Sequence, residues 1–303
     1  MTSSAIAVIV NAGSGGGNDQ ALVDRLAGHF QAAGLHAAIE LANGGDEIAA
    51  AVGNAIARRP PLIVAGGGDG TVSTVAAALV DTGIVFGVLP LGTLNHFARD
   101  LGIPLELADA VAVLANGKPG RVDVGEVNGR IFVNNSGLGL YPDIVRERER
   151  QQRRLGRGKW PAFAWATLSA LRRFPFLVVG LVVDGNEVLR KTPFVFIGNN
   201  EYRMEGFAIG ERSGIEDGQL SLYVAQRPGR WRLLQLALRA LTGRLRQVRD
   251  FDAILATEIV VESRRKRLRV ATDGEVTVMT PPLRYRIRPA SLVVMRPETR
   301  LTP

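Results

Sequence analysis

The sequence predicts two domains of different class, an α/β domain with a parallel sheet followed by a mainly antiparallel β domain. Up to about residue 122, short apolar runs alternate with segments of helical spacing, which is typical of strands and helices in succession. Beyond it, runs rich in Val, Ile, Leu and Phe follow one another with turn residues between them. The length of 303 residues also corresponds to about two domains.

In the first half, strands and helices are expected in regular alternation. The apolar run 5–10 predicts a strand, a glycine-rich loop follows it, and apolar residues at helical spacing over 21–30 predict a helix. This alternation predicts a mostly parallel sheet with helices on both faces. The further elements are strands at 36–41, 62–65 and 84–89 and helices at 46–57 and 72–80.

The second half is expected to form an antiparallel β domain. Asp184-Gly185 lies between two apolar runs, which is a strong signal for a β-hairpin. Helical insertions are expected near 143–173 and 229–245. The expected strands are 130–134, 176–183, 193–197, 219–225, 258–262, 268–271, 276–279, 284–288 and 291–295.

Composition excludes several classes of site. The chain has no cysteine, so disulfides, zinc thiolate sites and cysteine nucleophiles are excluded, and three histidines make a multi-histidine metal site unexpected.

The net charge is +8, and it is unevenly distributed along the chain. Residues 1–125 hold 6 basic and 11 acidic side chains, whereas residues 126–303 hold 31 basic and 18 acidic side chains. Such asymmetry indicates that the two halves have different partners.

No targeting or membrane-spanning segment is expected. The N-terminus lacks the basic region of a signal peptide, and the longest apolar helical run, 160–171, is too short to span a bilayer. We therefore expect a cytoplasmic protein.

Three glycine-containing loops, 11–17, 66–71 and 91–95, follow three of the expected strands. Loops at the carboxyl ends of parallel strands converge on one crevice. Glycine lets backbone N–H groups approach a ligand and helix N-termini favour anions, so three such loops suit a triphosphate. Neither the dinucleotide-binding nor the Walker glycine pattern is present. Ordinary βα turns are the alternative for each loop.

These loops and three later motifs resemble the diacylglycerol kinase catalytic-domain family, which includes bacterial soluble lipid kinases and sphingosine kinases. Six motifs occur in the family's order over nearly the whole chain, which is specific for the superfamily but not for the substrate. They are Asn11-Ala12-Gly13-Ser14-Gly15, Gly67-Gly68-Asp69-Gly70-Thr71, the segment 90–99, Asn135-Ser136-Gly137-Leu138-Gly139, Asp217-Gly218-Gln219-Leu220 and Asp273-Gly274-Glu275.

The resemblance implies a fold like that of phosphofructokinases and NAD kinases, with a C-terminal β-sandwich. The implied domains are 1–122 with about 291–303, which bind nucleotide, and 123–290, which bind the lipid. The implied cofactors are ATP and Mg²⁺. The implied nucleotide-binding residues are Asn11, Ala12, Gly13, Ser14, Gly15, Gly67, Gly68, Asp69, Gly70, Thr71, Val72, Ser73, Thr74, Thr93 and Asn95, with Asp69 acting on the nucleotide-bound Mg²⁺.

For the second domain the resemblance implies a catalytic pair and a metal site. Asp273 is expected as the general base on the lipid hydroxyl with Glu275 beside it, and which of the two takes the proton stays open. Asp217 is expected to hold a structural Mg²⁺ with the carbonyls of Gly214 and Gln219. Phosphoryl transfer needs backbone donors, a divalent ion and a carboxylate that orients the nucleophile. Plain turn aspartates are the alternative at both places.

The chain departs from the family pattern at three positions. Ala12 replaces a proline, and Asn43 stands near a position where the family usually has a threonine that contacts ATP. His96 stands where the family commonly has an aspartate, and a neutral histidine cannot supply the same anionic acceptor. The replacement of this aspartate by His96 therefore raises the question of whether Mg²⁺ binds with the family's geometry and whether the protein is active.

Basic residues cluster in three segments of the second half. Residues 146–159 hold seven basic side chains ahead of Trp160, residues 227–249 hold seven arginines and no acid, and residues 264–269 add five more cations. Basic stretches beside Trp and Phe suit an anionic membrane surface. Solvated faces are the alternative, and nucleic acid is not expected because no RNA- or DNA-binding motif accompanies the charge.

The expected function is that of an ATP-dependent lipid kinase, a transferase that phosphorylates diacylglycerol to phosphatidate in phospholipid metabolism. The expected partners are the lipid substrate and, peripherally, an anionic membrane; the oligomeric state is left open. One alternative is a soluble metabolite kinase of the NAD kinase type. Another is a catalytically weakened nucleotide- or lipid-binding regulator, because of His96.

Overall fold

The computed structural model describes residues 6–15, 19–139, 177–183, 185–192, 194–205, 208–212, 214–225 and 251–298. The chain divides into two compact units, residues 1–124 with 289–303 and residues 125–288. The chain leaves the first unit after Val124 and returns to it after Arg288. The boundaries expected from the sequence, 122 and about 291, lie close to these two crossings.

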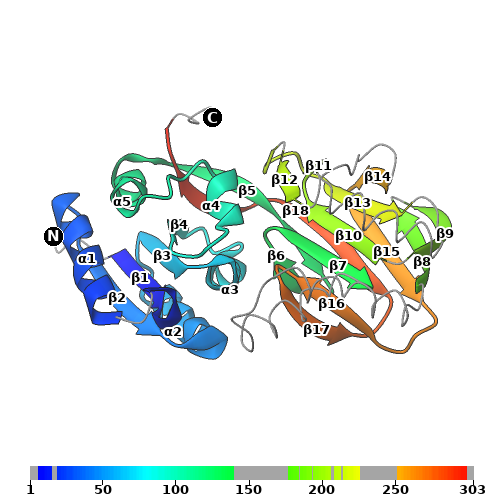
Figure 1. Ribbon diagram of the computed structural model, residues 1–303, viewed down its shortest axis with the longest axis horizontal. Helices are drawn as coiled ribbons and strands as arrows, with labels where there is room; N and C mark the ends of the chain where they lie inside the picture. The colour runs from blue at the N-terminus through cyan, green and yellow to red at the C-terminus, as the bar shows by residue number, and fades with distance from the viewer. Residues whose placement is uncertain are drawn as a thin grey trace, which may run out of the picture. The chain divides into compact units, whose positions relative to one another are not determined.

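The first unit is built on a parallel sheet. Its strands lie in the order β2 (Ala37–Ala42), β1 (Ile6–Asn11), β3 (Leu62–Gly67) and β4 (Val85–Pro90), and every neighbouring pair is parallel. β3 is buried over its whole length, which explains its continuous apolar sequence. The predicted parallel α/β domain is therefore confirmed (Figure 1).

Helices cover this sheet in two groups. α2 (Gly44–Arg58) packs on α3 (Asp69–Leu79), whereas α1 (Asp19–Ala32) packs on α5 (Leu107–Asn116). In α2 the buried residues are Ile48, Ala51, Val52 and Ala55, the spacing of one helix face. The short α4 (His96–Asp100) follows the third glycine loop, and α5 was not expected from the sequence, although its buried residues also follow helical spacing.

The end of the chain corrects one prediction. Strands were expected at 284–288 and 291–295, but a single strand, β18 (Leu283–Arg296), contains both. Pro289 indicated a break, and Ala290 does adopt a left-handed φ of 51°. The Ala290 N–H instead donates to an Asp123 carboxylate oxygen at 2.8 Å, and Arg121 donates to the Ala290 carbonyl at 3.0 Å. Both partners belong to β5 (Lys118–Val127), which the sequence did not predict.

The second unit is an antiparallel β-sandwich, as predicted. One sheet places β15 (Glu258–Ser263) between the start of β18 and β8 (Leu177–Val183), with β9 (Asn186–Thr192) beyond β8. A separate pair is formed by β11 (Tyr202–Glu205) and β12 (Ala208–Arg212). The second sheet has the order β14 (Phe251–Ala256), β13 (Leu220–Ala225), β10 (Phe194–Asn199), β7 (Asn135–Gly139), β16 (Leu268–Thr272) and β17 (Glu275–Met279).

The hairpin predicted around 184–185 is confirmed. Val183 at the end of β8 pairs with Asn186 at the start of β9, and Gly185 has a φ of 86° that a glycine adopts without strain. Asp184 itself and the helices expected near 143–173 and 229–245 lie outside the described residues.

The core of the second unit lies between its two sheets. Leu181, Ile259 and Val261 from one sheet pack with Ile197 and Leu222 from the other, among further buried side chains. The buried Tyr285 of β18 lies 3.1 Å from the Ser136 hydroxyl of β7, which donates its own proton to the Ala271 carbonyl. Tyr285 therefore donates to Ser136, and burial raises the pKa of the Tyr285 phenol above its ordinary value.

Candidate active site

The first two glycine loops of the first unit are joined by a side chain. Asn11 ends β1, and its amide nitrogen donates to the Thr71 hydroxyl in α3 at 3.2 Å. Its amide oxygen accepts the Gly13 N–H at 3.2 Å, in the short 3₁₀ turn η1 (Ala12–Gly15). Asn11 thus links the loops that follow β1 and β3, two adjacent strands of the parallel sheet.

The second and third loops touch through glycine backbones. A Cβ at Gly92 would lie 2.4 Å from the Cα of Gly68, and one at Gly67 would lie 2.5 Å from the Thr71 hydroxyl oxygen. The Leu91 N–H also donates to the Gly67 carbonyl at 3.2 Å. Side chains are therefore sterically excluded at these glycines, which is the local reason for the glycine-rich sequence.

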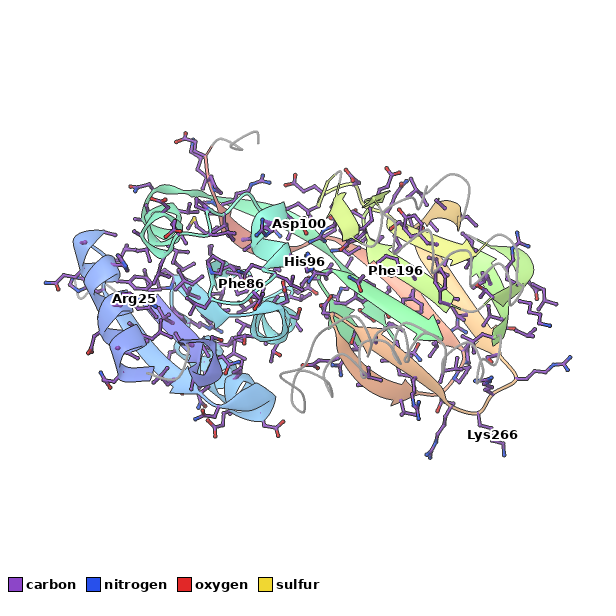
Figure 2. All side chains as sticks on the ribbon, in the orientation of Figure 1. Arg25, Phe86, His96, Asp100, Phe196 and Lys266 are labelled. Carbon is purple, nitrogen blue, oxygen red and sulfur yellow. The ribbon has the colours of Figure 1, made fainter. Side chains whose placement is uncertain are left out.

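Asn95 has a structural task in the third loop. It is buried with a left-handed φ of 51°, its amide oxygen accepts the Gly92 N–H at 2.9 Å, and its amide nitrogen donates to the carbonyls of Gly92 and Pro90. These bonds shape the loop, so the contribution of Asn95 here is to the loop geometry. The next residue, His96, is exposed at the start of α4 (Figure 2).

Asp69 carries an unused acceptor. It begins α3, where the N-terminal end of the helix favours negative charge, and its Oδ1 is buried with no hydrogen-bond partner in the described part of the chain. The hydroxyl oxygen of Ser73, one helical turn later, is also buried with no hydrogen-bond partner among the described residues. A buried carboxylate oxygen without a donor is costly, and a cation satisfies it. Oxygen donors are those that Mg²⁺ prefers, so Asp69 fits a magnesium-bound phosphate group.

The remaining predicted nucleotide-binding residues differ in what they can offer. Val72 and Ala12 are buried in the core, so only their main chains are available to a ligand. The Thr74 hydroxyl donates to the Gly70 carbonyl at 2.9 Å, whereas Thr93 is exposed. Ser14 and Gly15 lie in η1.

Asp273 occupies the turn between β16 and β17 with a left-handed φ of 49°. Its Oδ1 accepts the N–H groups of Asn134 at 2.8 Å and Asn135 at 3.0 Å, and its Oδ2 accepts the Val133 N–H at 2.8 Å. Its own N–H donates to the Asn135 carbonyl at 2.8 Å. Donors of this kind stabilise the anionic carboxylate and hold it in place, so Asp273 is better suited to anchoring the turn than to accepting a proton.

Glu275, two residues later, has a different environment. Its side chain is 54% exposed and forms an ion pair with Arg130 of β6 (Arg130–Phe132) at 2.6 Å. The same guanidinium donates through Nε to the Thr272 hydroxyl at 2.8 Å. Glu275 is thus an oriented carboxylate that a substrate can reach. The sequence could not choose between the two acids, and in the structure Glu275 is the more exposed one.

Two of the residues expected at the metal site, Gly214 and Asp217, lie together. A Cβ at Gly214 would lie 2.6 Å from both carboxylate oxygens of Asp217, so this acid sits directly against the Gly214 backbone. The Gln219 carbonyl accepts the Asn200 N–H at 2.9 Å. Within the described residues, no three His, Asp or Glu side chains gather as a metal cluster, so an ion here would depend on main-chain oxygens.

The basic segment 264–269 does not lie at the acidic turn. Arg264, Arg265, Lys266 and Arg267 are exposed in the connection from β15 to β16, whereas Asp273 follows the other end of β16 (Figure 2 labels Lys266). Five residues of strand separate the two, a distance of about 17 Å at the usual rise. The segments 146–159 and 227–249 lie outside the described residues.

Two arginines of the site were missed from the sequence. Arg130 lies 145 residues before its partner Glu275, and Arg212 of β12 contacts the segment that holds Asp273. Nothing local marks either residue, because both act on parts of the chain that are distant in sequence. The Asn128–Gly129 turn ahead of Arg130, in which both residues have positive φ, is the one nearby signal.

Family models match both halves of the chain. The model described as the diacylglycerol kinase catalytic domain matches residues 5–127, and the model described as the YegS C-terminal NAD kinase beta sandwich-like domain matches residues 143–296.

Relatives of known name match over most of the length. A protein of Mycobacterium tuberculosis named diacylglycerol kinase is 29% identical over 302 residues, covering 93% of this chain and 96% of that protein. A protein of Pseudomonas putida named probable lipid kinase YegS-like is 30% identical over 247 residues, covering 80% and 79%. The crystal structure of a diacylglycerol kinase from Bacillus anthracis superimposes with a TM-score of 0.70 at 20% identity over 98% of each chain, which shows a common fold.

Proposed function

This chain belongs to the diacylglycerol kinase catalytic-domain family of lipid kinases, and we propose that it transfers the γ-phosphate of ATP to the free hydroxyl of diacylglycerol, forming phosphatidate. The observation that carries the proposal is the first unit's loop cluster. There, glycine backbones in van der Waals contact surround the N-terminus of α3, where the buried Asp69 oxygen has no partner in the described part of the chain.

On the nucleotide side, the loops after β1, β3 and β4 would hold the phosphates through main-chain N–H groups, with the α3 N-terminus adding its favourable dipole. Asp69 would bind Mg²⁺, which offsets the phosphate charge. Asn11, Thr71 and Asn95 keep the loops in shape through their mutual and main-chain hydrogen bonds.

On the acceptor side, Glu275 would take the proton of the lipid hydroxyl. The hydroxyl oxygen forms a bond to the γ-phosphorus, the bond from that phosphorus to the bridging oxygen breaks, and ADP leaves. Arg130 orients the Glu275 carboxylate, and Asp273 fixes the turn that carries it. Asp217, with main-chain oxygens of Gly214 and Gln219, would hold a second, structural Mg²⁺.

The lipid substrate implies a peripheral encounter with a membrane. Among the residues that the structure describes, no helix is long and apolar enough to cross a bilayer. Cationic side chains near an anionic surface contribute about 1 kcal/mol each, and the four exposed cations of 264–267 supply part of such an attraction. We propose a peripheral, charge-driven association with anionic membranes.

The test is transfer of labelled γ-phosphate from ATP to a total lipid extract with Mg²⁺. The wild type is expected to label one lipid that co-migrates with phosphatidate, and Asp69→Ala and Glu275→Gln are expected to lose this label. Glu187→Gln, a charge change of the same kind at an exposed position of β9, serves as the control and is expected to keep it. Label found only in water-soluble products would overturn the lipid assignment in favour of a metabolite kinase.

A further inference from the structure

The main-chain segment 133–135 is the anchor on which the acidic turn of the second unit depends. It connects β6 to β7, and its three N–H groups all point at the carboxylate of Asp273. Because the Asp273 carboxylate accepts from all three N–H groups, a small rotation of any of these peptides would move this carboxylate. The placement of Glu275, two residues beyond Asp273, therefore rests on what holds the segment from its carbonyl side.

The carbonyl side is held by three side chains from β10, β11 and β12. The Val133 carbonyl accepts from the Asn199 amide at 2.9 Å and from Arg212 Nη1 at 2.7 Å. The Asn134 carbonyl accepts the Tyr202 hydroxyl at 3.0 Å and the Asn199 N–H at 2.9 Å. All carbonyls of the segment are engaged, since the Asn135 carbonyl accepts the Asp273 N–H.

Arg212 is the one charged side chain among these partners. Its Nη2 donates to the Asn134 side-chain oxygen at 3.2 Å while its Nη1 bonds the Val133 carbonyl, so the planar guanidinium spans two consecutive residues. Its central carbon lies 5.6 Å from the centre of the Tyr202 ring, within reach of a cation–π interaction. The hydrogen bonds to residues 133 and 134 and the contact with the Tyr202 ring therefore hold the Arg212 guanidinium in one orientation.

One peptide group connects Arg212 to Asp273. The Val133 carbonyl that accepts from Arg212 and the Asn134 N–H that donates to Asp273 belong to the same peptide plane. A cation at the oxygen and an anion at the hydrogen polarise this peptide in the same direction, and hydrogen bonds in such a chain strengthen one another. The pair behaves as an ion pair whose two members are separated by a single amide.

We infer that Arg212 is a positioning residue for the phosphoryl-transfer site, acting as the relayed counter-charge of Asp273 and thereby fixing the turn that presents Glu275. This inference rests on the proposed function and goes beyond it, because it gives Arg212 a role that acts on the acidic turn through the Val133–Asn134 peptide. It also explains why the site needs an arginine: a point charge cannot contact the Val133 carbonyl and the Asn134 side chain in the same plane.

The kinetic test uses the full chain with the labelled-phosphate assay. Arg212→Gln is expected to lower kcat by about tenfold to a hundredfold, the usual cost of a small misplacement of a catalytic group, with the KM for ATP within about twofold of wild type. Arg212→Lys keeps the charge and one donor and is expected to recover part of kcat. Arg284→Gln, which removes an exposed charge of β18 in the same unit, is expected to leave kcat unchanged.

A second readout does not depend on turnover. In a thermal-unfolding cycle of Arg212→Gln, Asp273→Asn and the double variant, the relay predicts that the double variant loses less stability than the sum of the two single losses. The same cycle with Arg284→Gln in place of Arg212→Gln is expected to be additive. Additive losses for the Arg212 pair, or a wild-type kcat in Arg212→Gln, would overturn the inference. A wild type that labels no lipid would defeat the proposed function alone, because the unfolding cycle still decides the relay.

Discussion

At the scale of single residues, Asp273 and Glu275 show how two acids of one turn take different tasks. Both carboxylate oxygens of Asp273 accept hydrogen bonds, from three main-chain N–H groups in all. Glu275 forms an ion pair with Arg130 and remains exposed. The first arrangement stabilises a conformation and the second leaves a carboxylate available for chemistry. Substitution should therefore separate stability from turnover.

We predict that Glu275→Gln lowers kcat by about a hundredfold or more, the contribution of a positioned general base, with an unchanged melting temperature. Asp273→Asn should instead lose about 3 kcal/mol of unfolding free energy. The side-chain nitrogen of an asparagine is a donor, so an amide cannot accept hydrogen bonds from all three N–H groups. Phosphate transfer and thermal unfolding of both variants check this. A stable but inactive Asp273→Asn would assign the proton transfer to Asp273.

Tyr285 predicts a pH dependence of stability. Burial raises the pKa of its phenol, so the folded state holds the proton at a pH where the unfolded chain, with an ordinary value near 10, has released it. The stability from this group is fully present below pH ~10 and is lost as pH rises further. Tyr285→Phe should flatten the fall of melting temperature between pH ~9 and ~11. An unchanged slope would show that other groups control alkaline unfolding.

His96 predicts a metal dependence. It is exposed at the start of α4, beside the loop that Asn95 shapes, where the family commonly has an aspartate. A carboxylate there would add an anionic acceptor for Mg²⁺ or its water ligands. His96→Asp is therefore expected to lower the Mg²⁺ concentration needed for half-maximal transfer, with the melting temperature within about 2 °C of wild type, as is usual for an exposed substitution. An unchanged Mg²⁺ titration would show that this position does not contribute to metal binding.

At the scale of elements, the glycine loops owe their geometry to close backbone contacts. Gly68 and Gly92 belong to different βα connections, and their main chains approach so closely that a Cβ at Gly92 would lie 2.4 Å from the Cα of Gly68. Such contacts bring the loops after β3 and β4 together as one surface. The loops after β3 and β4 thus form one structural element. Its shape depends on glycine positions, which have no side chain to take part in binding or catalysis.

Gly92→Ala is predicted to disturb this surface. The added Cβ would lie 2.4 Å from the Cα of Gly68 and 2.8 Å from the Asn95 amide oxygen, so the third loop has to shift. We expect a loss of about 1–3 kcal/mol of unfolding free energy, as for other overpacked sites, and a raised KM for ATP. Gly53→Ala in α2 is the matched control, because nothing lies within 4 Å of a Cβ there and the position lies outside the glycine loops. Equal KM values for the two variants would contradict the contact.

At the scale of the whole molecule, the distribution of charge separates the two halves of the chain. Residues 1–125 carry 11 acidic and 6 basic side chains, whereas residues 126–303 carry 18 and 31. The structure locates one part of this excess, the exposed turn 264–267, at the far end of β16 from the acidic turn. The charge proposed for membrane binding and the groups proposed for catalysis thus lie in different parts of the second unit.

We predict salt-sensitive binding to vesicles that contain anionic lipid and none to neutral vesicles. A variant with Gln at 264–267 should bind the anionic vesicles several-fold more weakly, because each cation contributes about 1 kcal/mol at most near the surface. Its transfer to a detergent-dispersed diacylglycerol should equal that of the wild type, since the turn lies about 17 Å from Asp273. Sedimentation in 50 and 300 mM salt checks this, and equal binding to neutral vesicles would contradict it.

Most of the parallel domain was predictable because its signals are local. An apolar run, a glycine loop and a helical repeat follow one another within about 30 residues, as in β1, η1 and α1. β5 and β7 escaped prediction because pairing with distant strands, β18 for β5 and β10 and β16 for β7, stabilises them more than local composition does. β18 was divided wrongly at Pro289 because the hydrogen bonds of Ala290 with β5 cannot be read from the sequence.

By itself, the sequence determined the order of the elements in the first unit, the sandwich class of the second and the six motifs of the family, since each depends on residues close together in the chain. Only the tertiary structure decided how the environments of the two acids of the 273–275 turn differ and which arginines contact this region. Arg130 and Arg212 reach Glu275 and the 133–134 segment across 145 and 79 residues. Contacts at that separation arise from the pairing of strands, which no local pattern encodes.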